Sequence, residues 1–144
     1  MASTVSGCGF GSSSTPRCVV AVSRHLVTGA LDPTFGEAGI ATAEFGTSLR
    51  LTGSRVKLLV DGTGRVSLVV PYWVSGTYGS FYGVQRWEAN GTPVAGFGTK
   101  GNVAFQLPSG EQRFDQLREA VQRKDGTVFI AATLFDSTSQ GYSH

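Results

Sequence analysis

Charged side chains are scarce in this sequence. Only 15% of its 144 residues are Asp, Glu, Lys or Arg, and the net charge is +2. A net charge this small produces too weak an electrostatic field to attract nucleic acid or an anionic membrane, and neither is expected as a partner. Apolar runs are short as well, because none approaches the roughly 20 residues that a helix needs to cross a bilayer. The first residues contain neither a basic segment nor an apolar stretch, so no secretory signal is expected and the sequence leaves the location unknown.

Residues that usually carry catalysis or bind metals are also few. The two histidines, His25 and His144, do not lie in a ligand-spaced cluster, so no metal site is expected. There is no Ser/His/Asp order and no close pair of carboxylates, which predicts a protein that is not an enzyme and holds no cofactor. Two cysteines, Cys8 and Cys18, would close a short loop if bridged, but nothing else marks an oxidising compartment, which favours two small thiols.

Glycine is plentiful, with 20 residues, and its placement indicates an internal repeat. Residues 29–39 and 91–101 are two versions of one segment, and the positions that they share are 62 residues apart. A period of this size predicts a repeat architecture. The shared pairs are Gly29 and Gly91, Phe35 and Phe97, Gly36 and Gly98, Gly39 and Gly101, Arg24 and Arg86, and Gly64 and Gly126.

The two arginines of this pattern each end a predicted strand. Two interpretations are open for Arg24 and Arg86. They form an anion-binding ring, or they pair with a carboxylate or with turn carbonyls of the next strand, and the second interpretation is favoured.

Short runs of Val, Ile, Thr and aromatic residues between Gly, Asp and Asn predict an all-β fold. Asp61-Gly62-Thr63-Gly64 predicts a hairpin turn. Residues 111–123 have apolar side chains at helical spacing, but their counterparts at 49–61 are typical of a strand. Because equivalent positions of a repeat fold alike, a strand is favoured there, with a helical turn near Phe114 left open. The other predicted strands span residues 17–26, 40–45, 56–60, 66–70, 81–87, 103–107 and 128–134.

This pattern resembles the delta-60 repeat, a bacterial family of uncharacterised proteins regarded as β-propeller domains. The resemblance covers roughly residues 18–134 and implies propeller-like blades and a bacterial secreted or surface protein, with no catalytic or binding residues to transfer. The second copy departs from the pattern, because Pro93-Val94 stands where Leu-Asp is expected. The motifs that carry the resemblance are Leu31-Asp32-Pro33-Thr34-Phe35-Gly36 with Gly39, Asn90-Gly91, Phe97-Gly98 with Gly101, and the hairpin Val121-Gln122-Arg123-Lys124-Asp125-Gly126.

Each copy supplies about four strands, which is the content of one propeller blade. Residues 17–144 are therefore expected to form one β-repeat domain of two tandem four-stranded antiparallel blades, preceded by a flexible arm or weak hairpin at residues 1–16. The first strand, at residues 19–24, would complete the last blade if the two ends of the chain meet. A β-sandwich or a barrel is the alternative.

Two blades cannot close a ring of four to eight, and an isolated pair would leave its outer apolar faces uncovered. The expected function is that of a binding or scaffolding module that self-associates or that belongs to a longer chain with further repeats. The alternative is a small carbohydrate-binding protein, because exposed aromatic rings stack well on sugars. Its candidate ligand-binding residues are Tyr72, Trp73 and Tyr78.

Overall fold

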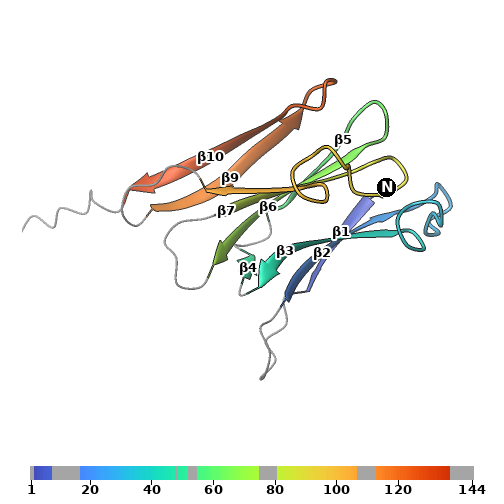
Figure 1. Ribbon diagram of the computed structural model, residues 1–144, viewed down its shortest axis with the longest axis horizontal. Helices are drawn as coiled ribbons and strands as arrows, with labels where there is room; N and C mark the ends of the chain where they lie inside the picture. Colours follow the sequence, from blue (N-terminus) through green and yellow to red (C-terminus); the bar gives the residue numbers. More distant parts are fainter. Residues whose placement is uncertain are drawn as a thin grey trace, which may run out of the picture.

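The computed structural model describes residues 2–7, 17–47, 49–51, 55–74, 81–106 and 113–136. All secondary-structure elements in this part of the chain are β-strands, and all strand pairs are antiparallel. The all-β prediction is therefore confirmed. The strands form three sheets that lie side by side as layers, here named the first, middle and last sheets (Figure 1).

Most strands fall where the sequence predicted them. The first sheet contains, in spatial order, β1 (Ala2–Gly7), β2 (Arg17–Arg24) and β3 (Ile40–Thr47). In the middle sheet, β4 (Leu49–Leu51) and β5 (Lys57–Val60) both pair with β6 (Val66–Val74), which is followed by β7 (Phe81–Trp87) and β8 (Asn102–Gln106). The last sheet consists of β9 (Arg113–Gln122) and β10 (Val128–Asp136).

The structure confirms a strand and a hairpin that the sequence favoured. The segment with helical spacing forms strand β9, including Phe114, because its pairing with β10 overrides the local pattern. The hairpin between β5 and β6 is also confirmed. There, Val60 pairs with Val66, and the Asp61 carboxylate accepts hydrogen bonds from the amide and the hydroxyl of Thr63.

The predicted arrangement of the strands is wrong in two respects. Instead of two four-stranded sheets, the described residues form sheets of three, five and two strands, which close into neither a barrel nor a propeller. Strand β2 does not complete the last sheet, because it pairs with β1 and β3, while β10 pairs only with β9 in this part of the chain. The physical reason is competition for the free edge of β2: β1 lies close to β2 in the chain, so it pairs with that edge at a much smaller loss of chain entropy than β10 would.

The segment expected to be an arm contributes a strand. Residues 2–7 form β1, which pairs antiparallel with β2 from Ala2 opposite Arg24 to Gly7 opposite Val19. This pairing corresponds to the hairpin alternative. Residues 1 and 8–16, including Cys8, lie outside the described part of the chain.

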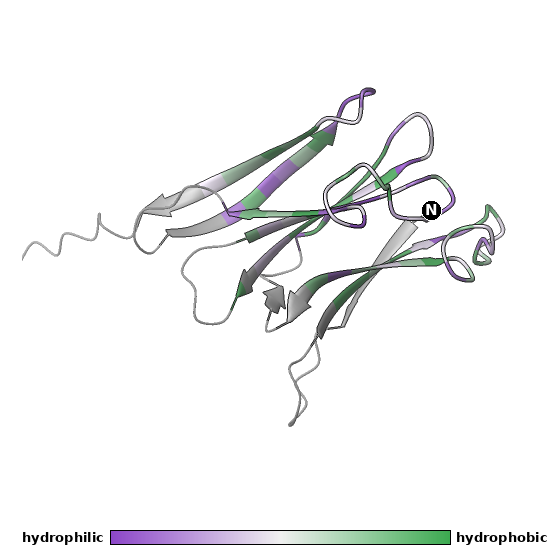
Figure 2. Ribbon diagram, viewed as in Figure 1, coloured by the Kyte–Doolittle hydropathy of each residue, from purple (hydrophilic) through white to green (hydrophobic). Residues whose placement is uncertain are grey.

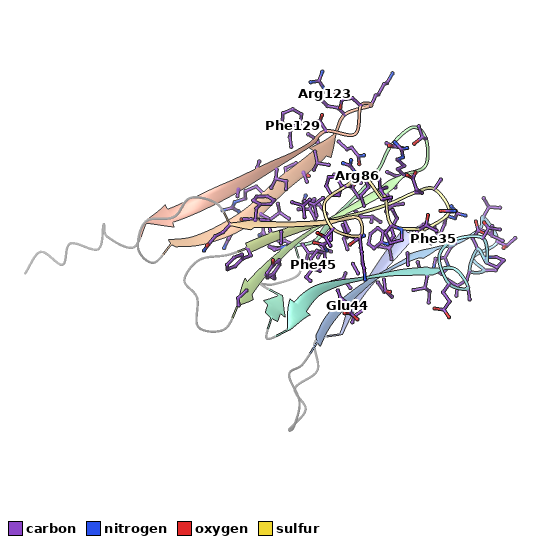
Figure 3. The ribbon with its side chains drawn as sticks, viewed as in Figure 1. Phe35, Glu44, Phe45, Arg86, Arg123 and Phe129 are labelled. Atoms are coloured by element: carbon purple, nitrogen blue, oxygen red, sulfur yellow. The ribbon has the colours of Figure 1, made fainter. Side chains whose placement is uncertain are left out.

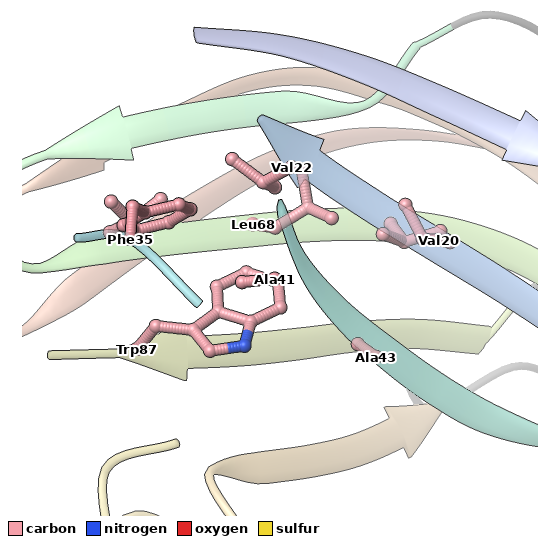
Figure 4. Close-up of a cluster of buried hydrophobic side chains, with 9 residues drawn as sticks. Val20, Val22, Phe35, Ala41, Ala43, Leu68 and Trp87 are labelled. Carbon is pink, nitrogen blue, oxygen red and sulfur yellow. The ribbon is translucent and has the colours of Figure 1, made fainter. Parts of the chain in front are cut away.

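A hydrophobic cluster lies between each pair of neighbouring sheets. Between the first and middle sheets, Val22 and Phe35 pack with Leu68 and Trp87 (Figure 4). Between the middle and last sheets, Val69, Tyr82 and Val84 pack with Leu117 and Ala120. Because alternate residues of a strand face opposite sides of its sheet, β6 supplies Leu68 to one cluster and Val69 to the other. Figure 2 shows these hydrophobic stretches along the strands, with hydrophilic residues at several turns.

Residues 62 apart share an unusual backbone conformation in the described part of the chain. Among them are two non-glycine residues with positive φ, Ala38 at 50° and Lys100 at 52°, a conformation rare outside glycine. The connections β2–β3 and β7–β8 also share hydrogen bonds, since the amide of Arg24 donates to Gly39 O at 3.0 Å and that of Arg86 to Gly101 O at 2.7 Å. The glycine pairs with matching φ are Gly29 and Gly91 (87° and 82°), Gly36 and Gly98 (58° and 55°), Gly39 and Gly101 (94° and 77°), and Gly64 and Gly126 (84° and 87°).

Candidate interaction surface

Arg24, at the end of β2, links the first sheet to the middle sheet. Its Nε donates to the carboxylate of Asp32 at 2.9 Å, and its Nη2 donates to the hydroxyl of Thr34 at 2.8 Å. Its Nη1 donates to the carbonyl of Ala89 in the connection between β7 and β8, and the guanidinium carbon lies 4.9 Å from the centre of the Phe35 ring. The interpretation as a structural arginine, paired with a carboxylate and a turn carbonyl, is confirmed for this residue.

Arg86 makes the corresponding link between the middle and last sheets (Figure 3). It donates to the Ser67 hydroxyl at 3.2 Å and to the carbonyl of Gly126, and it lies 4.2 Å above the Phe97 ring. Burial, together with the neighbouring positive charge of Arg65, lowers the pKa of its guanidinium from the ordinary value. The side chain is therefore used in packing two sheets together, as the structural interpretation predicted.

A groove of about 610 Å³ opens between the middle and last sheets next to Arg86. Its polar groups are engaged in turns: the Asp125 carboxylate, for example, accepts the amide of Thr127 at 2.9 Å. The rest of the groove wall is apolar, so it suits an apolar side chain or strand more than a charged ligand. The apolar lining residues are Val84, Phe97, Val103, Phe105, Val128 and Ile130.

The corresponding space between the first and middle sheets is filled by a tryptophan that has no described counterpart in this groove. There the indole of Trp87, on β7, is only 1% exposed and fills the space against the first sheet (Figure 4). In the last sheet the described strands are β9 and β10, so no described residue takes the place that Trp87 has in the middle sheet. The groove is thus the volume that a further strand beside β10 would cover.

The last sheet also leaves an apolar face uncovered. Val128 and Ile130 face the middle sheet, so Phe129 lies on the opposite side of β10, where it is 52% exposed beside Val121 at 53% (Figure 3). The residue 62 positions before Phe129, Ser67, is fully buried in the middle sheet. The nine-residue strand β10 has one edge without a partner strand in the described part of the chain. Such an edge is a template for pairing with another chain.

Three aspartates have lowered pKa values, and each stabilises a turn. Hydrogen bonds from the threonine two residues later are the largest cause for Asp32, Asp61 and Asp125. A surface ion pair also joins two sheets: Lys57 Nζ lies 2.9 Å from Glu119 Oε1 and holds the pKa of that carboxyl below its usual range. None of the described His, Cys, Asp and Glu side chains forms a group of three able to hold a metal ion.

The three candidate carbohydrate-binding residues do not form one described surface. Tyr72 is 3% exposed and its ring stacks on Phe81 at 5.6 Å between centroids, with Phe45 at 6.0 Å on another side. Trp73 lies on β6 with its backbone opposite Arg50, but its side chain is outside the described part, as is all of Tyr78. Tyr72 is therefore a packing residue here, and a role for the other two stays a prediction.

Val121 and Phe129, the exposed large apolar residues of the described part of the last sheet, were not predicted from the sequence as interface residues. A signal was present, because the 62-residue offset places Phe129 at the position of Ser67. A large apolar residue where the counterpart is small and polar indicates a different neighbour on that face.

None of the described segments forms a helix long and apolar enough to span a membrane. Comparisons of the chain with protein-family models, with curated proteins and with solved structures gave no match. The likeness to the delta-60 repeat therefore depends on the sequence motifs alone.

Proposed function

We propose that this chain is a non-catalytic interaction module of the β-propeller type, in which each sheet is a blade, and that it works by associating with further copies of itself. The observation that carries the proposal is the matching of strand pairs 62 residues apart, combined with two flanking sheets that are incomplete relative to the middle one.

Strand register supports the assignment of blades. In β5–β6, Leu59 pairs with Ser67, and in β9–β10 the residues 62 positions later, Val121 and Phe129, pair in the same way. The pair β2–β3 matches β7–β8 equally, since Val22 opposite Ala41 corresponds to Val84 opposite Val103. The four strands β5 to β8 then form a complete blade. The last sheet holds the first half of another blade, and the first sheet holds the second half of one.

The incomplete blades explain why association is expected. A complete blade buries both apolar faces against its neighbours, as the middle sheet does with Leu68 on one side and Val69 on the other. The last sheet instead keeps Val121 and Phe129 half exposed beside an apolar groove. A soluble protein tolerates few such contiguous patches, because covering them releases about 25 cal/mol for each Å² of apolar surface.

Size-exclusion chromatography with light scattering tests this function. A single chain has a mass of 15.1 kDa, and we expect the measured mass to rise with concentration toward a multiple of that value. Circular dichroism at each concentration checks that the β structure is retained. A folded protein that keeps the mass of one chain at millimolar concentration would overturn the proposal.

A further inference from the structure

We propose that copies of this chain associate head to tail, with β10 of one copy pairing antiparallel with β2 of the next, in the place that β1 occupies in the single chain. The inference rests on the proposed function and adds which strands meet, in which register, and what blocks the contact. The groove beside β10 would then be covered by β2 and β3 of the second copy.

The partner strand is identified by the pairing of β6 with β7. There Val69 lies opposite Val84, and Val70 lies opposite Gly83. Strand β10 corresponds to β6, and β2 corresponds to β7, at an offset of 62 residues. The same register between two copies gives a defined set of opposite residues. The pairs are Phe129 with Arg24, Ile130 with Ser23, Ala131 with Val22, Ala132 with Ala21, Thr133 with Val20, and Leu134 with Val19.

Strand β1, which pairs with this edge of β2 in the single chain, contains few large apolar residues. Its sequence is Ala-Ser-Thr-Val-Ser-Gly, with one large apolar residue in six, and it pairs with the same six residues of β2. The competing segment of β10 is Phe-Ile-Ala-Ala-Thr-Leu. Exchange of β1 for β10 keeps the number of strand pairs at β2 constant. It brings Phe, Ile and Leu to three positions that Ala, Ser and Gly hold in β1, while Val5 gives way to an alanine. The exchange is therefore favoured by burial of apolar surface once two copies meet.

A hydrogen bond between neighbouring connections supports the same arrangement. The amide of Gly36 in the first sheet donates to the carbonyl of Asn90 in the middle sheet at 2.8 Å. The corresponding amide, that of Gly98, makes no such bond within the described part of the chain. The residue that corresponds to Asn90 is Thr28, and in the proposed contact Thr28 of the second copy lies next to Gly98 of the first. Each junction would thus repeat a bond that already joins the first and middle sheets.

The exposed aromatic ring of the last sheet also finds a counterpart. In the proposed register Phe129 lies directly opposite Arg24 of the second copy, within the reach of a cross-strand pair. Arg24 already lies over one aromatic ring, that of Phe35. A guanidinium beside a second ring adds a favourable cation–π contact.

The contact is heterologous, because β10 and β2 are different surfaces, so it produces a closed ring or an open filament. Each copy contributes the strands of two blades. Two to four copies would therefore supply about four to eight blades, the range in which propellers close. A closed ring has a mass of roughly 30 to 60 kDa, given 15.1 kDa for one chain.

Disulfide trapping tests the register. In a background with Cys8 and Cys18 replaced by serine, whose association is checked first by light scattering, two single variants, Ala21→Cys and Ala132→Cys, are mixed at low concentration, concentrated and mildly oxidised. We expect a covalent dimer that contains one chain of each variant, because directly opposite residues of antiparallel strands are close enough for a disulfide. Ser23→Cys with Ala132→Cys is the matched control, shifted by two residues, and should give much less dimer.

A double variant tests the role of β1. Val5 lies opposite Ala21 in the single chain, so Val5→Cys with Ala21→Cys locks β1 onto β2. The oxidised protein should keep the 15.1 kDa mass of one chain, and a reductant should restore the larger mass.

The outcomes separate this inference from the proposed function. If the background protein associates but the mixed variants do not cross-link, or if Ala132→Cys cross-links to itself through paired β10 strands, the head-to-tail register is wrong while self-association stands. Association that is unaffected by the β1 lock also overturns the inference. A background protein that stays a single chain at every concentration overturns both.

Discussion

Phe129→Ser should weaken self-association with little effect on the stability of the single chain. The side chain is 52% exposed, and a phenylalanine presents about 200 Å² in total, so about 100 Å² remains to be covered by a second copy. At about 25 cal/mol per Å² this burial contributes up to about 2.5 kcal/mol. The dissociation constant of the variant should therefore rise by up to roughly 60-fold, since about 1.4 kcal/mol corresponds to a factor of ten.

Sedimentation equilibrium over a concentration series measures this change. Urea unfolding should show a loss of about 1 kcal/mol or less for Phe129→Ser, from its pairing with Val121 on β9. A variant that associates as tightly as the parent protein would refute the assignment of this face as an interface.

Three further predictions concern the stability of the fold. Trp87→Ala should lower the unfolding free energy by about 3–5 kcal/mol in urea titrations, because the indole is 1% exposed between two sheets and its loss leaves a cavity; a loss below about 1 kcal/mol would contradict that packing. Gly91→Ala should destabilise more than Gly29→Ala in the same assay. Both residues have positive φ, but a Cβ at Gly91 would lie 2.3 Å from the amide nitrogen of Gly36, whereas one at Gly29 meets nothing within 4 Å; equal losses would be the contrary result. The carboxyl pKa of Asp61 is lowered from its ordinary value of 3.8, mainly by the hydrogen bond from the Thr63 hydroxyl. The ionised carboxylate therefore stabilises the folded state above that value, and this contribution to the unfolding free energy is lost as the pH falls through the lower pKa of the folded state. Asp61→Asn should keep the turn, as Asn90 does with Thr92, and its unfolding free energy should fall less between pH 5 and pH 2 than that of the parent protein; identical pH profiles would contradict this account.

Local structure was largely predictable from the sequence. Alternating apolar residues and turn residues place β2, β3, β5, β6, β7, β8 and β10 close to their observed bounds, because these signals act over a few neighbouring residues. The 62-residue offset also favoured a strand for residues 111–123, although it left open the helical turn near Phe114 that the structure replaces by β9. The structural role of Arg24 followed from the same offset, since it ends a strand beside a carboxylate-bearing turn.

The candidate site was less predictable. Tyr72 belongs to an aromatic-rich segment that resembles a ligand-binding loop, yet β6 continues through Val74 and turns this ring onto Phe81. The exposed pair Val121 and Phe129 looked like ordinary strand residues, because exposure depends on which sheet lies opposite and not on the residues themselves.

The sequence by itself determined the strands, their turns and the spacing at which they recur, because these depend on φ preferences and on side-chain alternation within short segments. Only the tertiary structure decided which strands share a sheet and which faces stay uncovered. Hydrogen-bonded neighbours are chosen by competition between edges far apart in the chain, and at the edge of β2 that choice is made between β1 of its own chain and any strand that another chain brings.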